Sequence, residues 1–145
     1  MKVMIDACVL YPTVMREMVV GCAAQGLFTP CWSPRILEEW AQAAGKRAAA
    51  DELWARGEIA ALSAAFPQAL IRHDPQFERR FWLPDPHDVH VLAAAVAGSC
   101  DTILTLNAKD FPRDILGQEG VQRHDPDGFL LALWQDAPGA VAAVG

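Results

Sequence analysis

Short apolar runs alternate with longer helical segments along this chain, and this alternation limits the folds that it can adopt. Because a helical segment separates most successive strand candidates, the pattern predicts a parallel sheet with helices on both faces. The predicted fold is α/β, a three-layer α/β/α domain with a central parallel sheet of four to five strands. The strand candidates are Lys2–Ile5, Leu27–Trp32, Ala69–Arg72, Thr102–Leu106 and Gly120–His124.

Capping and turn residues set the bounds of the helical segments. Pro12 is predicted to be the first residue of a helix, and Ser33 followed by Pro34 is predicted to start another. Asp51 and Asp85 are candidate caps for two more helices. We expect one domain over residues 1–137 and a frayed tail over residues 138–145. The predicted helices span residues 12–25, 34–50, 51–66, 86–98, 111–116 and 126–135.

Length and composition favour a single cytoplasmic domain. A chain of 145 residues with 52% hydrophobic residues can bury a substantial core. No apolar run approaches the ~20 residues of a membrane span, and Asp6 interrupts the opening run too early for a signal peptide. The four cysteines are widely spaced, which is typical of reduced core thiols in a cytosolic protein.

The net charge of −6 argues against strong, non-specific binding to DNA. It does not exclude a phosphodiester substrate. Setting aside five candidate site acids leaves 13 acids against 12 Lys and Arg, so the remaining surface is close to neutral. Bound cations would also reverse the sign of an acidic pocket.

Five carboxylates follow or interrupt apolar segments, where an ionised group is costly unless something compensates it. A divalent cation is one such compensation, since Mg²⁺ and Mn²⁺ select hard oxygen ligands. In a parallel sheet, sites gather beyond the carboxyl ends of the strands. The pattern therefore indicates either a metal-dependent nuclease or an ordinary domain with scattered acids. The five residues are Asp6, Glu39, Asp85, Asp88 and Asp110.

The first two of these acids also have ordinary structural interpretations. Asp6 can cap the turn that follows the first strand. Glu38 and Glu39 are adjacent on a predicted helix, so they cannot both face inward equally. Glu39 lies nearer the buried side, beside Trp40, and Glu38 is expected to be solvated. A solvated Glu39 is the alternative.

The segment Leu83–Val96 contains the densest group of polar residues. Asp85 is well placed as an N-cap, and Asp88 then falls at the third helical position, where a carboxylate suits the helix dipole. These structural roles are sufficient by themselves. His87 and His90 lie three residues apart without the HExxH spacing, so they are interpreted as surface or supporting groups rather than ligands.

A hydroxyl, an amide and a carboxylate follow the clearest strand, at Thr105, Asn107 and Asp110. Together with Lys109 they could hold a metal-bound water and a phosphate oxygen. The same residues could equally form an Asx-type turn.

Together these segments resemble the PIN domain family, the compact ribonuclease fold of many bacterial toxin–antitoxin toxins, and in particular its VapC-like branch. The similarity spans nearly the whole chain, and the third and fourth segments are specific for the family. The matching segments are Met4–Leu10, Ser33–Trp40, Leu83–Val96, Thr105–Pro112 and His124–Leu130.

The resemblance implies a catalytic and metal-binding quartet, supported by Asp85, Thr105 and Asn107. The quartet consists of Asp6, Glu39, Asp88 and Asp110. These residues would hold one or two Mg²⁺ or Mn²⁺ ions per site. Many relatives carry aspartate at the position of Asn107, so this chain has one charge fewer for a second ion.

The implied activity is metal-dependent hydrolysis of phosphodiester bonds in single-stranded RNA, by the toxin component of a toxin–antitoxin pair. Arg16, Lys109 and Arg113 are candidate phosphate contacts. A small antitoxin protein and a second copy of the chain are the implied partners, with no membrane.

Three alternatives remain open. One is a catalytically inactive PIN fold that binds RNA or protein. Another is a phosphoacceptor receiver domain, which expects paired acids after the first strand, where this chain has Asp6 alone. A haloacid-type phosphatase would need an acid at the position of Cys8.

Overall fold

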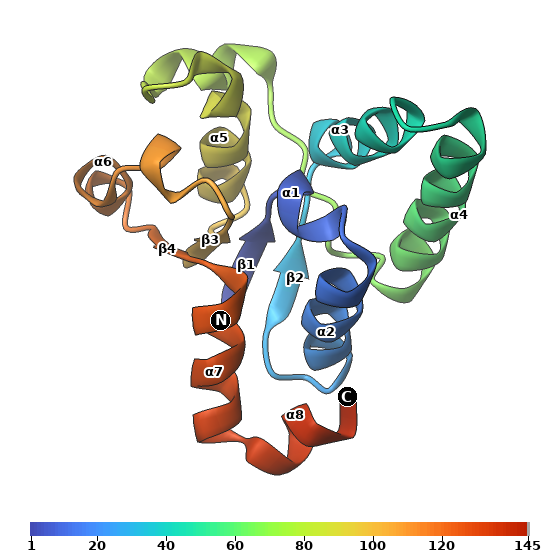
Figure 1. Cartoon of the computed structure of the whole chain (residues 1–145). Helices are drawn as coiled ribbons and strands as arrows, with labels where there is room; N and C mark the ends of the chain where they lie inside the picture. The colour runs from blue at the N-terminus through green and yellow to red at the C-terminus, as the bar shows by residue number, and fades with distance from the viewer. Residues whose placement is uncertain (145) are drawn as a thin grey trace.

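The centre of the molecule is a four-stranded parallel sheet, seen in a computed structural model that describes residues 1–144 (Figure 1). Gly145, the end of the expected tail, lies outside the described residues. The strand order is β2-β1-β3-β4, so the two central strands are β1 and β3. All neighbouring strands are parallel, as predicted. The strands are β1 (Lys2–Ile5), β2 (Thr29–Cys31), β3 (Thr102–Leu104) and β4 (Gln122–His124).

Helices flank both faces of the sheet, which confirms the predicted α/β fold. The chain moves one way across the sheet from β1 to β2 and the opposite way from β2 to β3. Right-handed crossovers therefore put α2 (Thr13–Ala24) and α5 (Val89–Ala97) on opposite faces. On one side α7 (Pro126–Asp136) contacts α2, and on the other α6 (Arg113–Gln118) contacts β4.

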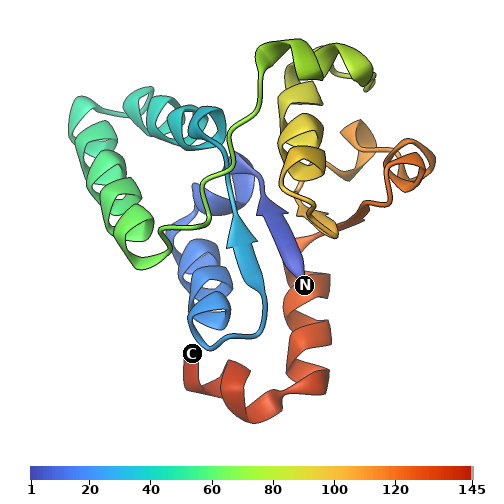
Figure 2. The same cartoon turned by 180° about the vertical axis from the view of Figure 1, so that it is seen from behind.

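A helical hairpin of α3 (Pro34–Gly45) and α4 (Ala49–Ala65) extends to one side of the sheet (Figures 1 and 2). Ser33 caps α3 as predicted, accepting a 3.1 Å hydrogen bond from the Ile36 backbone N–H. The prediction of one helix over residues 34–50 is wrong, because the chain reverses after Gly45 and α4 packs against α3. The side chain of Glu52 on α4 lies close over Gly45, at the end of α3.

Other predicted bounds also change. A short helix, α1 (Ala7–Leu10), precedes Pro12, and Pro12 is the N-cap of α2 rather than its first residue. Asp51 lies in the first turn of α4, whose N-cap is Ala48. Residues 69–72 form no strand in the described structure. They make a single bridge, Trp32↔Leu70, because Ser33 turns the chain into α3 and leaves no further partner.

The segment after α7, expected to be frayed, forms α8 (Pro138–Val144), and Val141 of this helix is buried. Among residues 1–144, no helix combines the length and apolar character that crossing a bilayer requires. The core lies between the sheet and its helices. Its largest fully buried side chains are Trp32, Trp40, Phe111, Met4, Ile5, Leu10, Ile36, Leu83, Leu92, Ile103, Leu104 and Leu116.

Candidate metal centre

Asp6 lies directly after β1, at the carboxyl end of a central strand. Its side chain is only 5% exposed. One carboxylate oxygen accepts a 2.8 Å hydrogen bond from the Ala7 backbone N–H, which makes Asp6 the N-cap of α1. Burial raises the pKa of Asp6 above its ordinary value, while the hydrogen bonds from Thr105 and Ala7 oppose that shift. Asp6 is therefore both a cap and a buried acid at the predicted edge of the sheet.

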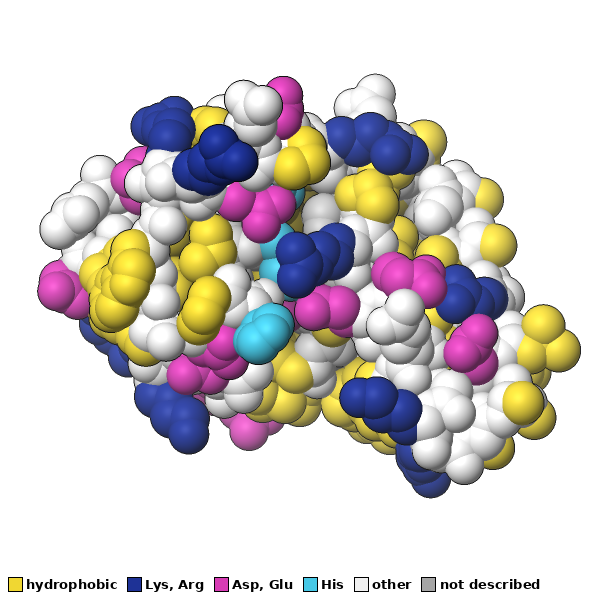
Figure 3. Space-filling view, turned by 90° about the horizontal axis from the view of Figure 1, so that it is seen from above, with side chains coloured by type: hydrophobic (Ala, Val, Ile, Leu, Met, Phe, Trp, Pro, Cys, Tyr) yellow, Lys and Arg dark blue, Asp and Glu magenta, His cyan; other side chains and the backbone are white. Residues whose placement is uncertain are grey.

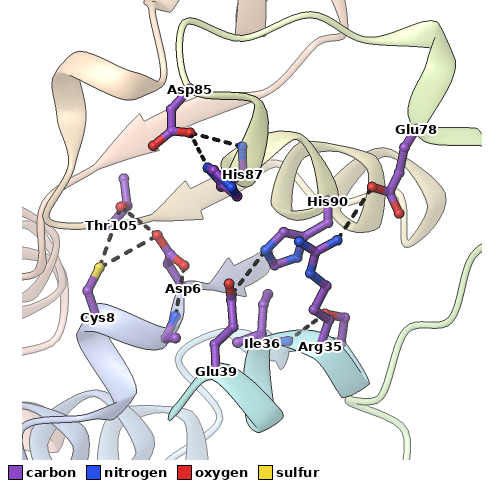
Figure 4. Close-up of polar contacts among 12 residues, drawn as sticks. Asp6, Cys8, Arg35, Ile36, Glu39, Glu78, Asp85, His87, His90 and Thr105 are labelled. Atoms are coloured by element: carbon purple, nitrogen blue, oxygen red, sulfur yellow. Dashed lines mark hydrogen bonds and ion pairs between the residues drawn. The ribbon is translucent and has the colours of Figure 1, made fainter. Parts of the chain in front are cut away.

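Thr105 holds the other oxygen of Asp6. Ile5 and Leu104 are paired in register, so the next residues of the two strands, Asp6 and Thr105, emerge side by side. The Thr105 hydroxyl donates a 2.9 Å hydrogen bond to Asp6 Oδ2 and accepts one of 3.1 Å from the Asn107 backbone N–H. Figure 4 shows Asp6, Thr105 and Cys8 meeting at this point. The side chain of Asn107 is exposed.

Cys8 lies beside both Asp6 and Thr105. Its thiol lies 3.6 Å from Asp6 Oδ2 and 3.7 Å from the Thr105 hydroxyl. Burial and the charge of Asp6 raise the pKa of Cys8 to about 11. At neutral pH Cys8 is therefore a neutral thiol and adds no negative charge beside Asp6.

Three further carboxylates form a compact group. Asp85, Asp88 and Asp110 each place one oxygen within 4.8 Å of the others. Asp85 and Asp88 bracket a 3-10 turn, η2 (Pro86–Asp88), that precedes α5, and Asp110 ends η3 (Ala108–Asp110) after β3. All three side chains are partly buried.

The pKa of Asp88 is raised by burial and by the neighbouring acids. Burial raises it to about 6, and the charges of Asp6, Asp85 and Asp110 contribute in the same direction. The charge of Asp6 therefore acts on Asp88, although Asp6 is not one of the three clustered carboxylates. Asp85 keeps its predicted capping role as well, since it accepts a 2.9 Å hydrogen bond from the His87 backbone N–H.

Glu39 approaches the acids from α3. Its charge contributes to the raised pKa of Asp6, but it lies outside the group of three carboxylates. Glu39 Oε1 lies 3.0 Å from His90 Nε2 in an ion pair drawn in Figure 4. Its neighbour Glu38 faces away and pairs with Arg56 at 2.9 Å, so the choice between the two glutamates follows the expected division.

His90 is the residue whose placement the sequence pattern did not reveal. The sequence predicts His87 and His90 alike to be surface or supporting residues, but His90 is 1% exposed whereas the His87 side chain is 87% exposed. A signal was present in the helical period. His90 lies one turn before Ala94, within the buried run of α5, and this position faces the core.

The candidate phosphate contacts lie in two different settings. Lys109 and Arg113 are exposed, on either side of Asp110. Arg16 is buried, and its Nη1 donates hydrogen bonds to the carbonyl oxygens of Leu10 and Tyr11 at 2.7 and 3.1 Å. Its guanidinium also lies over the Trp40 ring at 4.8 Å. These contacts give Arg16 a structural role in joining α1, α2 and α3.

The donor set suits a hard divalent cation. Three carboxylates provide oxygen ligands close enough to share one ion, and such oxygens are what Mg²⁺ and Mn²⁺ select. Burial is the main cause of the raised pKa of Asp88, and the charges of Asp6, Asp85 and Asp110 add to it; a bound cation would offset both effects. The residues present therefore fit a divalent ion.

The fold is an α/β domain with a parallel four-stranded sheet, and a cluster of three carboxylates forms an acidic site beyond the strand ends. Residues 2–109 match the sequence model of the PIN domain, and the chain belongs to this family. The matched region ends directly before Asp110.

One similar curated protein is "Putative ribonuclease VapC50" from Mycobacterium tuberculosis, which is 44% identical to this chain over 57 residues. The aligned segment covers 37% of this chain and 34% of that protein, so the likeness spans about a third of the relative's length. No solved structure matches the chain.

Proposed function

We propose that this chain is a metal-dependent endoribonuclease that hydrolyses phosphodiester bonds in single-stranded RNA. The observation that carries the proposal is the group of Asp85, Asp88 and Asp110 oxygens within 4.8 Å of one another, beside the buried Asp6. Membership of the PIN domain family and the likeness to a protein named as a ribonuclease support the same reaction class.

In this proposal Asp88 and Asp110 of the quartet, together with Asp85, would hold a Mg²⁺ or Mn²⁺ ion, and the other two quartet members, Asp6 and Glu39, lie beside them. When bound, the cation supplies Lewis-acid polarisation of the phosphodiester and acidifies a water molecule. The Thr105 hydroxyl and the Ala7 N–H fix the orientation of the Asp6 carboxylate. His90 restrains Glu39 in the same way.

Lys109 and Arg113 are the remaining candidate contacts for the RNA backbone. Both are exposed beside Asp110, where a cationic side chain can meet a phosphate without being desolvated. Arg16 is not retained for this purpose, since its guanidinium already binds two carbonyl oxygens.

The family resemblance further supports a place in a toxin–antitoxin pair. A small antitoxin would block the acidic site, and a second copy of the chain would form a homodimer. Copurification of the chain with the product of an adjacent small reading frame, followed by recovery of cleavage after its removal, tests the antitoxin part.

A PIN fold that binds RNA without cleaving it is the second candidate. It is favoured by Asn107, because this amide stands where many relatives carry a carboxylate and therefore removes one negative charge from the site.

Cleavage of total RNA by the wild-type chain in Mg²⁺, in Mn²⁺ and in chelator tests the proposal. Asp6→Asn keeps an N-cap side chain, so we expect a folded protein without activity. Asp136→Asn, an exposed acid at the end of α7, is the matched control and should cleave normally. Equal activity of Asp6→Asn and wild type, purified identically, would disprove the assignment, and RNA binding without cleavage by wild type would favour the second candidate.

A further inference from the structure

A cavity outside the cluster of Asp85, Asp88 and Asp110 is lined by His90, the residue that contacts Glu39. Its volume is about 320 Å³, and its walls come from the start of α3, the segment after the Trp32↔Leu70 bridge, η1 (Pro75–Arg80) and α5. Ligand pockets typically begin at about 300 Å³. The cavity is therefore large enough for one small ligand and too small for several.

His90 joins the cavity to the candidate metal centre. It lines the cavity, and its Nε2 lies 3.0 Å from Glu39 Oε1. The Nε2 atoms of both imidazoles are engaged, that of His90 by Glu39 and that of His73 by Glu78 Oε2 at 3.0 Å. Within residues 1–144, the Nδ1 atoms of His90 and His73 are buried and have no hydrogen-bond partner. Buried polar atoms without partners are rare in proteins, so these two nitrogens are available to a polar ligand group.

The cavity carries both signs of charge, with the cations in excess. Arg35, Arg72 and Glu78 line it. Arg35 is only loosely paired, with Nη1 3.8 Å from Glu78 Oε1, and no ion pair involves Arg72 in the part of the chain that the structure describes. Figure 3 shows dark blue Lys or Arg side chains beside cyan and magenta ones in the middle of this face.

The first turn of α3 adds to this positive potential. Ser33, Pro34 and Arg35 all line the cavity, and the N-terminus of a helix carries a partial positive charge. Ser33 caps the Ile36 N–H, which leaves the Arg35 N–H without an intrahelical acceptor. Such a helix start, with two arginines beside it, is suited to a phosphate group.

The remaining walls are apolar, formed by Ile71, Pro34 and Pro75. Apolar and imidazole surfaces are what an unstacked base packs against in single-stranded RNA. The cavity thus combines a surface for a flat base with cations for a phosphate, at one nucleotide's size.

We infer that this cavity is a nucleotide-binding subsite, which holds the RNA nucleotide next to the phosphodiester bond cleaved at the acidic centre. The inference rests on the proposed function. The base packs against Ile71 and His73, while Arg35, Arg72 and the start of α3 bind the adjoining phosphate. The His90–Glu39 contact sets the subsite immediately beside the quartet, so occupancy of the subsite helps to position the scissile bond.

The test compares full-length wild type with Arg35→Ala/Arg72→Ala, using a short fluorogenic single-stranded RNA in Mg²⁺. We expect KM to rise about tenfold while kcat changes less than about twofold, because two phosphate contacts are lost and the carboxylates are untouched. Arg35→Ala/Arg72→Lys should bind the RNA more tightly than the double alanine variant, because lysine keeps the charge at position 72. Arg56→Ala is the matched control on α4, where the arginine pairs with Glu38 and Glu52.

To separate the two proposals, the arginine substitutions are combined with Asp6→Asn, so that the RNA is bound without being cleaved. The Kd for the same RNA is then measured by fluorescence anisotropy at several salt concentrations. Loss of a phosphate contact lowers the slope of log Kd against log salt by about 0.7 for single strands, which a purely structural defect would not do. If wild type cleaves RNA and the arginine variants keep its KM and salt slope, the subsite is wrong and the nuclease proposal stands.

The other outcomes are equally decisive. If wild type binds RNA without cleaving it, and the arginine variants bind more weakly with a shallower slope, the subsite stands and catalysis is disproved. A chain that neither binds nor cleaves RNA overturns both. Unchanged RNA affinity of the variants, with lost affinity for an oligoglutamate peptide, would assign the cavity to an acidic protein segment and overturn the subsite.

Discussion

The Thr105 hydroxyl and the Asp6 carboxylate are joined by a 2.9 Å hydrogen bond between neighbouring strand ends, one register step beyond the pair Ile5↔Leu104. This bond is fixed by the pairing of the two central strands. It therefore links the geometry of the sheet directly to the protonation state of a buried site acid.

Replacing Thr105 by valine should raise the pKa of Asp6 further, since the Thr105 hydrogen bond lowers it. The ionised form of Asp6 would then be reached at higher pH, so the acid limb of the pH–rate profile should move upward. We also expect a loss of about 1–2 kcal/mol in the free energy of unfolding, measured with urea. Thr102→Val, at another buried threonine of β3, is the control. An unmoved acid limb in Thr105→Val would contradict this role.

Asp88 should make stability depend on both pH and metal. Its pKa in the folded chain is raised to about 6, so the folded state binds more protons than the unfolded state between about pH 4 and 6. Stability from this group therefore falls as pH rises through that window. We expect Mg²⁺ or Mn²⁺ to raise the Tm at pH 7.5 and to raise it much less at pH 5.

The matching variant is Asp88→Asn. The Asp88 side chain makes no capping hydrogen bond, so the substitution removes no cap. It should raise the metal-free Tm at pH 7.5 and abolish the increase caused by the cation, as measured by differential scanning calorimetry. Retention of the full cation-induced increase would show that Asp88 does not bind the ion.

Glu39→Gln should separate catalysis from metal binding. Glu39 contacts His90 but lies outside the group of three carboxylates, so the cation-induced rise in Tm should largely persist. Cleavage should fall about 10- to 100-fold, the usual cost of removing a supporting group at a metal site. Glu38→Gln, which breaks an exposed ion pair with Arg56, should leave kcat/KM unchanged. Equal activities of the two variants would remove Glu39 from the site.

Asn107→Asp would add a charge beside Thr105 and Asp110. We expect divalent ions to bind about fivefold more tightly, corresponding to about 1 kcal/mol, or with higher stoichiometry. Calorimetric titration with Mn²⁺ measures both quantities. Asn107→Ala keeps the backbone N–H that bonds to Thr105 and should titrate like wild type. Identical isotherms for all three proteins would show that position 107 does not influence the ions.

The sequence predicted the elements whose pattern is local. Lys2–Ile5 and the β-branched run at Thr102 gave the two central strands, and Ser33 gave the start of α3 correctly. The elements that depend on contacts distant in the sequence are predicted less well. The sequence predicts a break between two helices after residue 50, whereas it falls at residues 46–48, where α4 turns to pack against α3. The short helix α1 is not predicted, because four residues are too few to show a helical period.

The same distinction applies to the candidate site. The position of Asp6 at a strand end follows from the predicted parallel sheet. The strand predicted to run to Leu106 ends at Leu104, so that Thr105 is the residue beside Asp6, and the sequence does not predict which carboxylates converge. Asp85 joins Asp88 and Asp110, whereas Glu39 is held apart by His90. The burial of Arg16 depends on carbonyl groups in a turn that no sequence pattern specified.

Helix α4 buries far fewer residues than the sheet or its neighbour α3. Among the described residues of α4, Ala55 is the buried one, while Leu53 and Trp54 are 76% and 71% exposed. Elements with few buried apolar contacts open locally at a lower free energy than core strands do. Amides of α4 should therefore exchange with deuterium many times for each global unfolding event, while Asp6 and Thr105 stay paired at the ends of β1 and β3.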